Sequence, residues 1–217
     1  MTPELSIVVP VYDEAESLPE LAARIRAACE ETGIAFETWL IDDGSTDNTP
    51  QIAARLAAND PRLRVVTGSV EPPHGWLGKA HACHRLYSEM LAESEPSYVL
   101  FTDADVRFEP DAVAHAVAAA RGLEAGLLSV FPMQRTVSWA ERLAVPLFLH
   151  WAVYTFLPLP LAFTRRTGPA FAAANGQFML FKREAYDACG GHEEVRAEIL
   201  EDVTLARSVK RAGYRAI

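Results

Sequence analysis

The chain has 217 residues, of which 50% are hydrophobic and 23% are charged, and this composition fits one large α/β domain over residues 1–217 with a sizeable core. Its formal net charge is -9 and no run of lysines or arginines interrupts it, so we expect no nucleic-acid partner. The three cysteines are widely spaced and never form a Cys-x-x-Cys pair, which implies neither a disulfide framework nor a zinc site and favours a reducing compartment.

Short apolar runs alternate with helical patterns along the chain. The predicted strands cover residues 5–11, 36–42, 63–68, 97–103 and 126–132. The predicted helices between them cover residues 16–31, 48–59, 78–93 and 111–122. This alternation is typical of a three-layer α/β/α fold with a largely parallel sheet, in which ligands bind at the carboxyl ends of the strands.

Acidic residues follow three of the predicted strands. They are Asp13 and Glu14 after the first strand, Asp42 and Asp43 after the second, and Asp103 and Asp105 after the fourth. Two carboxylates as close as Asp103 and Asp105 repel each other unless a cation lies between them, so this pair predicts a cation site. A solvated turn is the alternative for a lone Asp-x-Asp. In the segment 41–50, Ser45, Asp47 and Asn48 can likewise build a turn and cap the next helix, or the acids there can bind a nucleotide.

One later stretch approaches membrane character. About twenty mostly apolar residues, the length of a membrane span, lie between Arg142 and Arg165, although internal prolines argue against a simple span. Two interpretations of Leu143 to Phe163 remain, an interfacial helix anchored by Trp151 and Tyr154 or a piece of core packed against the sheet. The bracketing arginines favour the interfacial helix.

Four stretches carry a family resemblance: "SIVVPVYDE", "IDDGSTDNT", "FTDADV" and "GGHEEVRAEILEDVTLARSVKRAGYR". In this order and spacing they resemble the family 2 glycosyltransferases, inverting enzymes with the GT-A nucleotide-sugar fold. The stretches "PPHGWLGKAHAC" and "ANGQFMLFKREAYDACGGH" are similar to the membrane-associated branch that glycosylates hopanoid, carotenoid or other lipid acceptors. The resemblance implies a nucleoside-diphosphate sugar donor, usually UDP-linked, a lipid or other hydroxyl acceptor, and a location at the cytoplasmic face of the membrane surface.

The same resemblance assigns donor-binding residues. Pro10, Tyr12 and Glu14 fall where the family lines its nucleoside pocket, and Tyr12 is placed to stack on the base. Asp43 falls where an acid meets the base, usually uracil. Lys79 falls where a basic residue approaches the diphosphate or the ribose, and the alternative for it is an ordinary lysine at a helix start.

The metal and the catalytic base are also implied by the resemblance. Asp105 matches a direct ligand of Mg²⁺ or Mn²⁺, and Asp103 lies nearer the ribose or a metal-bound water. Asp202 matches the general base that an inverting transfer requires, with its neighbour Glu201 ranked second. The alternative for Asp202 is an acid that only stabilises the start of a helix.

Four further residues attract attention without a clear role. His74, His81, Cys83 and His84 crowd together, but no acidic partner stands at zinc-site spacing, so we interpret them as helix surface. The pair Gly190–Gly191 predicts a tight turn before the segment of the base.

The family pattern continues past Ile217, where this chain stops inside an expected strand, so we interpret the catalytic domain as truncated and transfer activity is not assured for it.

Two rival classes remain. A haloacid-dehalogenase-type phosphatase also carries Asp-x-Asp after an apolar strand, but it usually has Thr or Val where this chain has Arg107. A non-catalytic donor-binding or membrane-scaffold domain would keep the fold, and only an activity measurement distinguishes it from an active enzyme.

Overall fold

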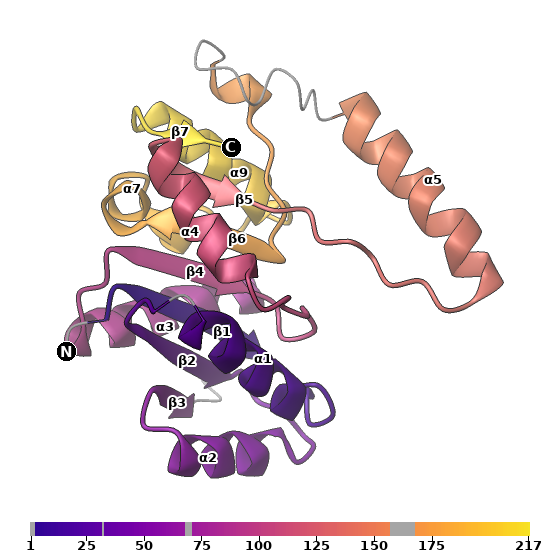
Figure 1. Ribbon diagram of the computed structural model, residues 1–217. Helices are drawn as coiled ribbons and strands as arrows, with labels where there is room; N and C mark the ends of the chain where they lie inside the picture. Colours follow the sequence, from indigo (N-terminus) through magenta and orange to yellow (C-terminus); the bar gives the residue numbers. More distant parts are fainter. Residues whose placement is uncertain (1–2, 32, 68–70, 157–167) are drawn as a thin grey trace.

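Seven strands form one sheet in the order β3-β2-β1-β4-β6-β5-β7 in the computed structural model, which describes residues 3–31, 33–67, 71–156 and 168–217 (Figure 1). The strands are β1 (Leu5–Val11), β2 (Phe36–Asp42), β3 (Leu63–Thr67), β4 (Tyr98–Thr102), β5 (Ala125–Ser129), β6 (Phe178–Lys182) and β7 (Arg215–Ala216). The helices are α1 (Leu18–Glu30), α2 (Thr49–Asn59), α3 (Gly78–Glu93), α4 (Ala112–Gly122), α5 (Trp139–Phe156), α7 (Arg183–Ala188), α8 (Gly191–Glu194), α9 (Glu201–Arg211) and the 3₁₀ turn η1 (Pro169–Phe171). The predicted α/β fold with a mostly parallel sheet is confirmed.

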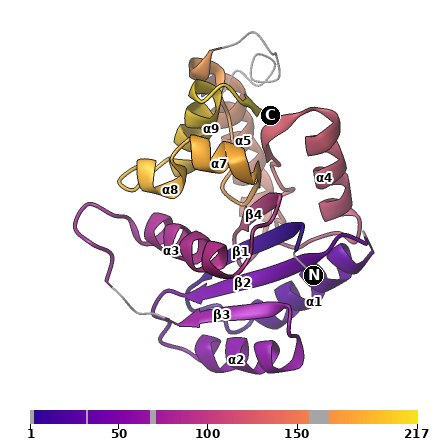
Figure 2. The ribbon, with the colours of Figure 1, turned by 90° about the vertical axis from the view of Figure 1, so that its left-hand side faces the viewer.

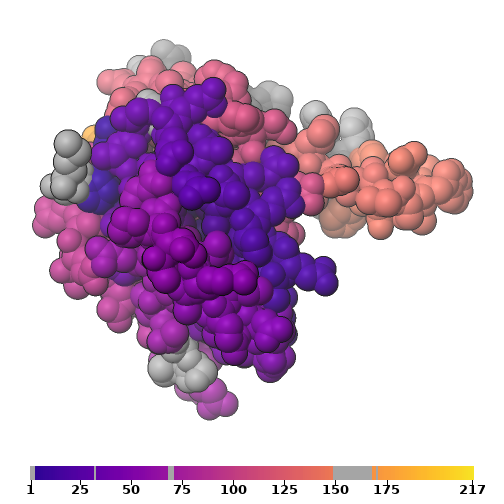
Figure 3. Space-filling model, turned by 60° about the horizontal axis from the view of Figure 1, so that its bottom comes forward, coloured from indigo at the N-terminus to yellow at the C-terminus, as the bar shows by residue number. Residues whose placement is uncertain are grey.

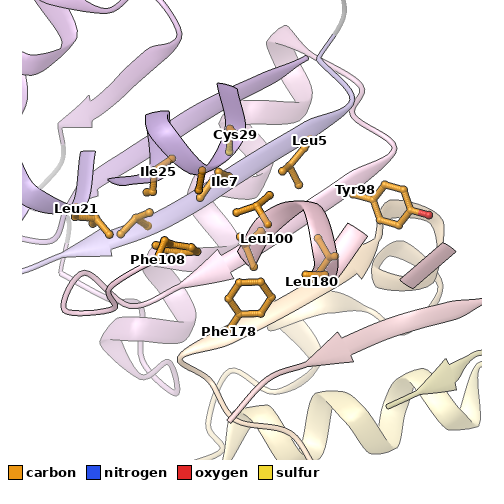
Figure 4. Packing of buried hydrophobic residues seen from close by; sticks show 14 of the residues in the cluster. Leu5, Ile7, Leu21, Ile25, Cys29, Tyr98, Leu100, Phe108, Phe178 and Leu180 are labelled. Carbon is orange, nitrogen blue, oxygen red and sulfur yellow. The ribbon is translucent and has the colours of Figure 1, made fainter. Parts of the chain in front are cut away.

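The side chains of the central strands alternate between two cores, one on each face of the sheet. Ile7 and Val9 of β1 pack in the cluster that α1, α2 and α4 cover, whereas Val8 joins the cluster under α3, α7 and α9. Figure 4 shows Ile25 of α1 beside Ile7 on the first of these faces. Burying one such side chain contributes about 1.5–3 kcal/mol, so both helical layers are fixed firmly to the sheet.

Strand β6 is absent from the sequence prediction, and it is the strand that breaks the parallel pattern. It lies between β4 and β5 and runs antiparallel to both. Its first residue, Phe178, therefore pairs with Thr102, the last residue of β4, at the carboxyl edge of the sheet. Because "FMLFK" is a short apolar run followed at once by α7, its periodicity does not distinguish a strand from a buried helix.

Helix α5 projects away from the rest of the molecule (Figures 1 and 3). Trp139, Leu143 and Leu147 lie four residues apart on this helix and expose 79%, 60% and 69% of their surface. The core interpretation of this stretch is therefore wrong for its described part, while residues 157–167 and the side chains of Trp151 and Tyr154 lie outside the described residues. Within the described part of the chain, no helix combines the length and the apolar character that crossing a membrane would need.

The predicted Gly190–Gly191 turn is confirmed, because both residues have positive φ angles of 82° and 53°. It leads into His192, whose ring lies in the core beside Tyr186. The Tyr186 hydroxyl contacts His192 Nδ1 at 2.6 Å and accepts a hydrogen bond from the His192 N–H at 3.0 Å. A side chain at Gly191 would place its Cβ 2.6 Å from Cε1 of the Tyr186 ring.

We expect Gly191→Ala to destabilise the fold by about 2–4 kcal/mol, because the new methyl group meets a buried ring and the backbone keeps a left-handed conformation. The shift of the urea unfolding midpoint measures this loss. Gly213→Ala is the matched control, since Gly213 also has a positive φ of 88° but no atom lies within 4 Å of its Cβ position. Equal losses in the two variants would show that the backbone conformation alone sets the cost.

Candidate active site

A pocket of about 350 Å³ opens at the carboxyl edge of the sheet. It is lined by Pro10, Val11, Tyr12, Glu14, Asp43, Lys79, Asp103, Ala104 and Asp105. The ends of β1, β2 and β4 and the start of α3 thus bring together all the predicted donor-side and metal residues. Their individual roles stay predictions.

The loop after β1 is held by the loop after β2. The Glu14 N–H donates to Thr49 Oγ1 at 2.8 Å, and the Ala15 N–H donates to Asp47 Oδ2 at 3.3 Å. Asp47 also accepts the Thr49 N–H at 2.9 Å, whereas the Asn48 side chain makes no capping hydrogen bond. The segment 41–50 therefore starts the next helix, as the turn interpretation predicts, and also fixes one wall of the pocket.

The two acids at the end of β2 have different environments. Asp42 is buried, and its Oδ1 accepts the Ser45 N–H at 3.1 Å, which makes it part of the turn. Asp43 faces the pocket, and its Oδ2 lies 3.3 Å from the Cβ position of Gly78 at the start of α3. Partial burial raises the pKa of the Asp43 carboxyl, although nearby His81 opposes this effect. Only the second acid is therefore placed to meet a ligand.

Lys79 joins the pocket to helix α9. Its Nζ lies 2.7 Å from Asp103 Oδ1 and 3.5 Å from Glu201 Oε1. Burial alone would lower the pKa of Lys79, but the carboxylates of Asp103 and Glu201 raise it to about 12. A cation in the first turn of a helix opposes the helix macrodipole, so its place in α3 is better explained by these carboxylates than by helix stability.

The carboxylates at this pocket suit a hard divalent cation that binds together with a diphosphate. Asp103 is partly buried and Asp105 is exposed, and both line the pocket. In the residues that the structure covers, no group of three His, Cys, Asp or Glu side chains gathers closely enough to hold a metal ion by itself. Mg²⁺ is typically bound by one or two carboxylates together with substrate phosphates, so a pair of aspartates at the pocket fits that mode.

Asp202 lies in the first turn of α9, next to Glu201. Its Oδ2 accepts the Gly176 N–H at 3.0 Å, and its Oδ1 accepts the N–H of Val203 at 2.7 Å. A Cβ on Gly176 would lie 3.2 Å from Lys79 Nζ and 3.8 Å from Asp202 Oδ2. Asp202 does not line the pocket, yet Gly176 places it close to the Lys79 end of the site.

Gly176 is the site residue that the sequence interpretation missed. Its signal is the dipeptide Asn-Gly at 175–176, a frequent turn sequence, which directly precedes the missed strand β6. Asn175 is fixed to the end of β5, because its N–H donates to Ser129 Oγ at 2.7 Å. Thr102 Oγ1 donates to the Gln177 carbonyl at 2.9 Å, which fixes the same loop to the end of β4.

The assignment of the histidine and cysteine group to the helix surface is wrong for three of its members. His74 is exposed but lies in a turn before α3. His81 and Cys83 are buried, and Cys83 packs in the core under α3. His81 lies edge-on to Trp76, with ring centroids 5.6 Å apart, while His84 contacts the same ring at 5.1 Å. Residues 80–83 of α3 are all buried, so both His81 and Cys83 lie on the buried side of this helix.

The chain matches the model of the family described as glycosyl transferase family 2 over residues 6–190. It is also similar to the undecaprenyl-phosphate 4-deoxy-4-formamido-L-arabinose transferases of Pseudomonas syringae pv. syringae (strain B728a) and Pseudomonas fluorescens (strain SBW25). The identity is 34% over 111 residues for the first and 34% over 109 residues for the second. Each match covers 50% of this chain and 30% of the relative, so the chain spans less than a third of these relatives.

Solved structures share the fold at low sequence identity. The mannosyltransferase PcManGT from Pyrobaculum calidifontis, in complex with GDP-Man and Mn²⁺, has a TM-score of 0.69 and 22% identity, and the match covers 100% of this chain and 55% of that one. TarS from S. aureus in complex with UDP-GlcNAc has a TM-score of 0.58 and 16% identity, over 96% of this chain and 54% of that one. The architecture described above is therefore shared with structures that bind nucleotide sugars.

Proposed function

This chain belongs to glycosyl transferase family 2, and we propose that it is an inverting glycosyltransferase that moves a sugar from a UDP-linked donor to an acceptor hydroxyl of a lipid. The observation that supports this most strongly is the single pocket in which acids from three strand ends meet the Lys79 ammonium. Family membership argues against the phosphatase alternative.

In the proposed complex, the nucleoside lies between Tyr12 and Asp43. Tyr12 exposes 58% of its surface at the pocket, so its ring is available to stack on a base. Asp43 offers carboxylate oxygens that accept hydrogen bonds from an N–H of uracil. Pro10 and Glu14 complete this wall, and the loop hydrogen bonds described above keep the wall in place before the ligand binds.

Asp103 and Asp105 would hold Mg²⁺ or Mn²⁺ together with the donor diphosphate. When bound, the ion offsets the negative charge that develops on the departing nucleoside diphosphate. Lys79 adds a fixed positive charge on the same side of the pocket, because its ammonium contacts Asp103 in the structure. The cation-bearing side of the pocket is thus the leaving-group side of the reaction.

Inversion requires an acceptor oxygen that attacks from the face opposite the leaving group, and a base on that side that removes its proton. We assign this role to Asp202, whose carboxylate is oriented by the Gly176 and Val203 N–H groups. Glu201, by contrast, is turned toward Lys79.

A lipid acceptor at a membrane surface is supported by two observations. The curated relatives are named for transfer to undecaprenyl phosphate, a lipid carrier. Helix α5 exposes a stripe of Trp139, Leu143 and Leu147, the pattern of a helix that lies in a membrane interface. We propose that this helix rests on the cytoplasmic leaflet; the hopanoid or carotenoid class of acceptor is a finer proposal that rests on the sequence resemblance.

Thermal unfolding with a panel of nucleoside diphosphates tests the donor proposal. UDP at a hundred times its Kd should stabilise the fold by about 2.7 kcal/mol, which corresponds to roughly 5–10 °C in Tm for a chain of this size. GDP, CDP and ADP are the controls for the base, and each is measured with Mn²⁺ and with EDTA. Stabilisation by GDP in place of UDP would reassign the base, and no stabilisation by any of the four would contradict the proposal.

We expect Asp43→Ala to weaken UDP binding by about 10- to 150-fold, because the variant loses a hydrogen bond to a charged group, which contributes about 1.5–3 kcal/mol. Isothermal titration calorimetry measures the effect. The loss should be equal with Mn²⁺ and with EDTA, since the proposed partner of Asp43 is the base. A loss that appears only with Mn²⁺ would show that Asp43 acts on the metal side.

A further inference from the structure

Three side chains from two separate helices meet around one residue without a side chain. Lys79 Nζ, Glu201 Oε1 and Asp202 Oδ2 lie 3.2, 3.6 and 3.8 Å from the Cβ position of Gly176. They come from α3 and from the first turn of α9, while Gly176 precedes β6. Figure 2 shows α3 and α8 on the same side of the sheet, and the Leu77 N–H donates to the Arg196 carbonyl at 2.8 Å. The start of α3 and the segment before α9 are thus joined directly.

The loop that carries Gly176 is fixed on both sides of this residue, to β4 through Thr102 and to β5 through Ser129. Gly176 therefore cannot move easily to admit a side chain of its own. The distance between Lys79 Nζ and Glu201 Oε1 is 3.5 Å, longer than the 2.7 Å from the same Nζ to Asp103 Oδ1. Lys79 is held on one side by an acid of the donor pocket and on the other by an acid of the acceptor-side helix.

We propose that Glu201 is a positioning residue that holds the Lys79 ammonium in place for the donor diphosphate, and that Gly176 leaves the space in which this ion pair forms. The inference rests on the proposed function and deepens it, because it gives Glu201 a role in donor binding that is separate from the role of Asp202. It also explains why the two neighbouring acids are not equivalent.

The need for a second anchor follows from the position of Asp103. Asp103 and Asp105 form the pair proposed to bind the metal ion. When the donor binds, the Asp103 carboxylate therefore also contacts the metal ion or the donor and no longer serves Lys79 alone. Lysine has a long, flexible side chain with several rotatable bonds, and a single shared anchor restrains it poorly. Glu201 lies only 15% exposed at its side chain and remains available to Lys79 throughout, so it keeps the ammonium ordered.

The sign of the expected effect separates positioning from simple electrostatics. Glu201→Gln removes a negative charge near a polyanionic ligand, and this change alone should strengthen the binding of UDP. Loss of positioning should weaken it, because Lys79 is then free to turn away from the diphosphate. A weaker affinity of Glu201→Gln for UDP would therefore show that Glu201 positions Lys79.

A double-mutant cycle with UDP as the probe tests the inference by isothermal titration calorimetry, with Mn²⁺ and with EDTA. We expect Glu201→Gln to weaken UDP binding by about three- to tenfold in the unchanged background and by less than about 1.5-fold in a Lys79→Met background. Glu201→Asp should recover part of the affinity, since it restores the charge. Glu198→Gln is the control for charge, because Glu198 is an exposed acid of the same segment.

The outcomes distinguish this inference from the proposed function. If the unchanged chain binds UDP and Glu201→Gln binds it as tightly or more tightly, the positioning role is wrong while the donor assignment stands. Equal losses in the two backgrounds would show that Glu201 acts without Lys79 and would also overturn the inference. If the unchanged chain binds no UDP, the donor assignment and the inference both fall.

Discussion

Asp105→Asn is expected to reduce the affinity for UDP in the presence of Mn²⁺ by at least about tenfold and to leave the affinity in EDTA unchanged or slightly higher. The substitution replaces an anionic oxygen ligand by a neutral amide of nearly the same shape. Because Asp105 is exposed at the pocket, no core packing depends on it and the unfolding midpoint should not move. Calorimetry with the two conditions side by side measures the difference.

Glu109→Gln is the matched control for this experiment. Glu109 is an exposed acid four residues further along the same loop and does not line the pocket, so its variant removes one negative charge at a distance. A drop of similar size in both variants would assign the effect to net charge. Unchanged Mn²⁺-dependent affinity in Asp105→Asn would remove the Asp-x-Asp pair from the metal site.

The sequence predicts those parts of this fold that depend on local patterns. The runs at 5–11 and 36–42 are strands over their full predicted length, and the helical pattern at 78–93 is a helix with the same bounds. Buried parallel strands are continuous apolar runs and covering helices are amphipathic, so both are visible without any knowledge of contacts. The convergence of the acids also follows, since parallel strands end at the same edge.

The parts that the sequence does not predict depend on contacts between distant segments. Nothing local to Lys79 indicates that its ammonium pairs with Asp103 and Glu201, residues that are far away along the chain and arrive on β4 and α9. Gly176 is equally hidden, because its importance lies in the space it leaves between those side chains. The burial of Cys83 is a third example, since it depends on which face of α3 packs in the core.

Asp202→Asn should keep near-normal UDP binding and lose at least about two orders of magnitude in the rate of sugar transfer to a hydroxyl acceptor, the usual scale for removing a general base. Asparagine retains the shape of the side chain and one oxygen that accepts the Gly176 N–H, so the loop around Gly176 should stay in place. Steady-state transfer rates in the full chain, together with calorimetric affinities, separate chemistry from binding. An Asp202→Asn variant with unimpaired transfer to a hydroxyl would place the base elsewhere.

The same variant discriminates between the two kinds of lipid acceptor that the resemblance and the curated relatives suggest. A hydroxyl must lose its proton as it attacks, whereas a phosphate monoester has a second pKa of about 6 and is already largely deprotonated at neutral pH. Removal of the Asp202 carboxylate should therefore have a severe effect on transfer to a hydroxyl and a mild one on transfer to undecaprenyl phosphate in phospholipid vesicles. If transfer occurs only to the phosphate and Asp202→Asn leaves its rate within about threefold, Asp202 orients the Gly176 loop and is not the base. A different pair of results would separate the roles of the two acids. If Asp202→Asn loses transfer to a hydroxyl while Glu201→Gln loses mainly UDP affinity, Asp202 acts in the chemical step and Glu201 positions the donor site.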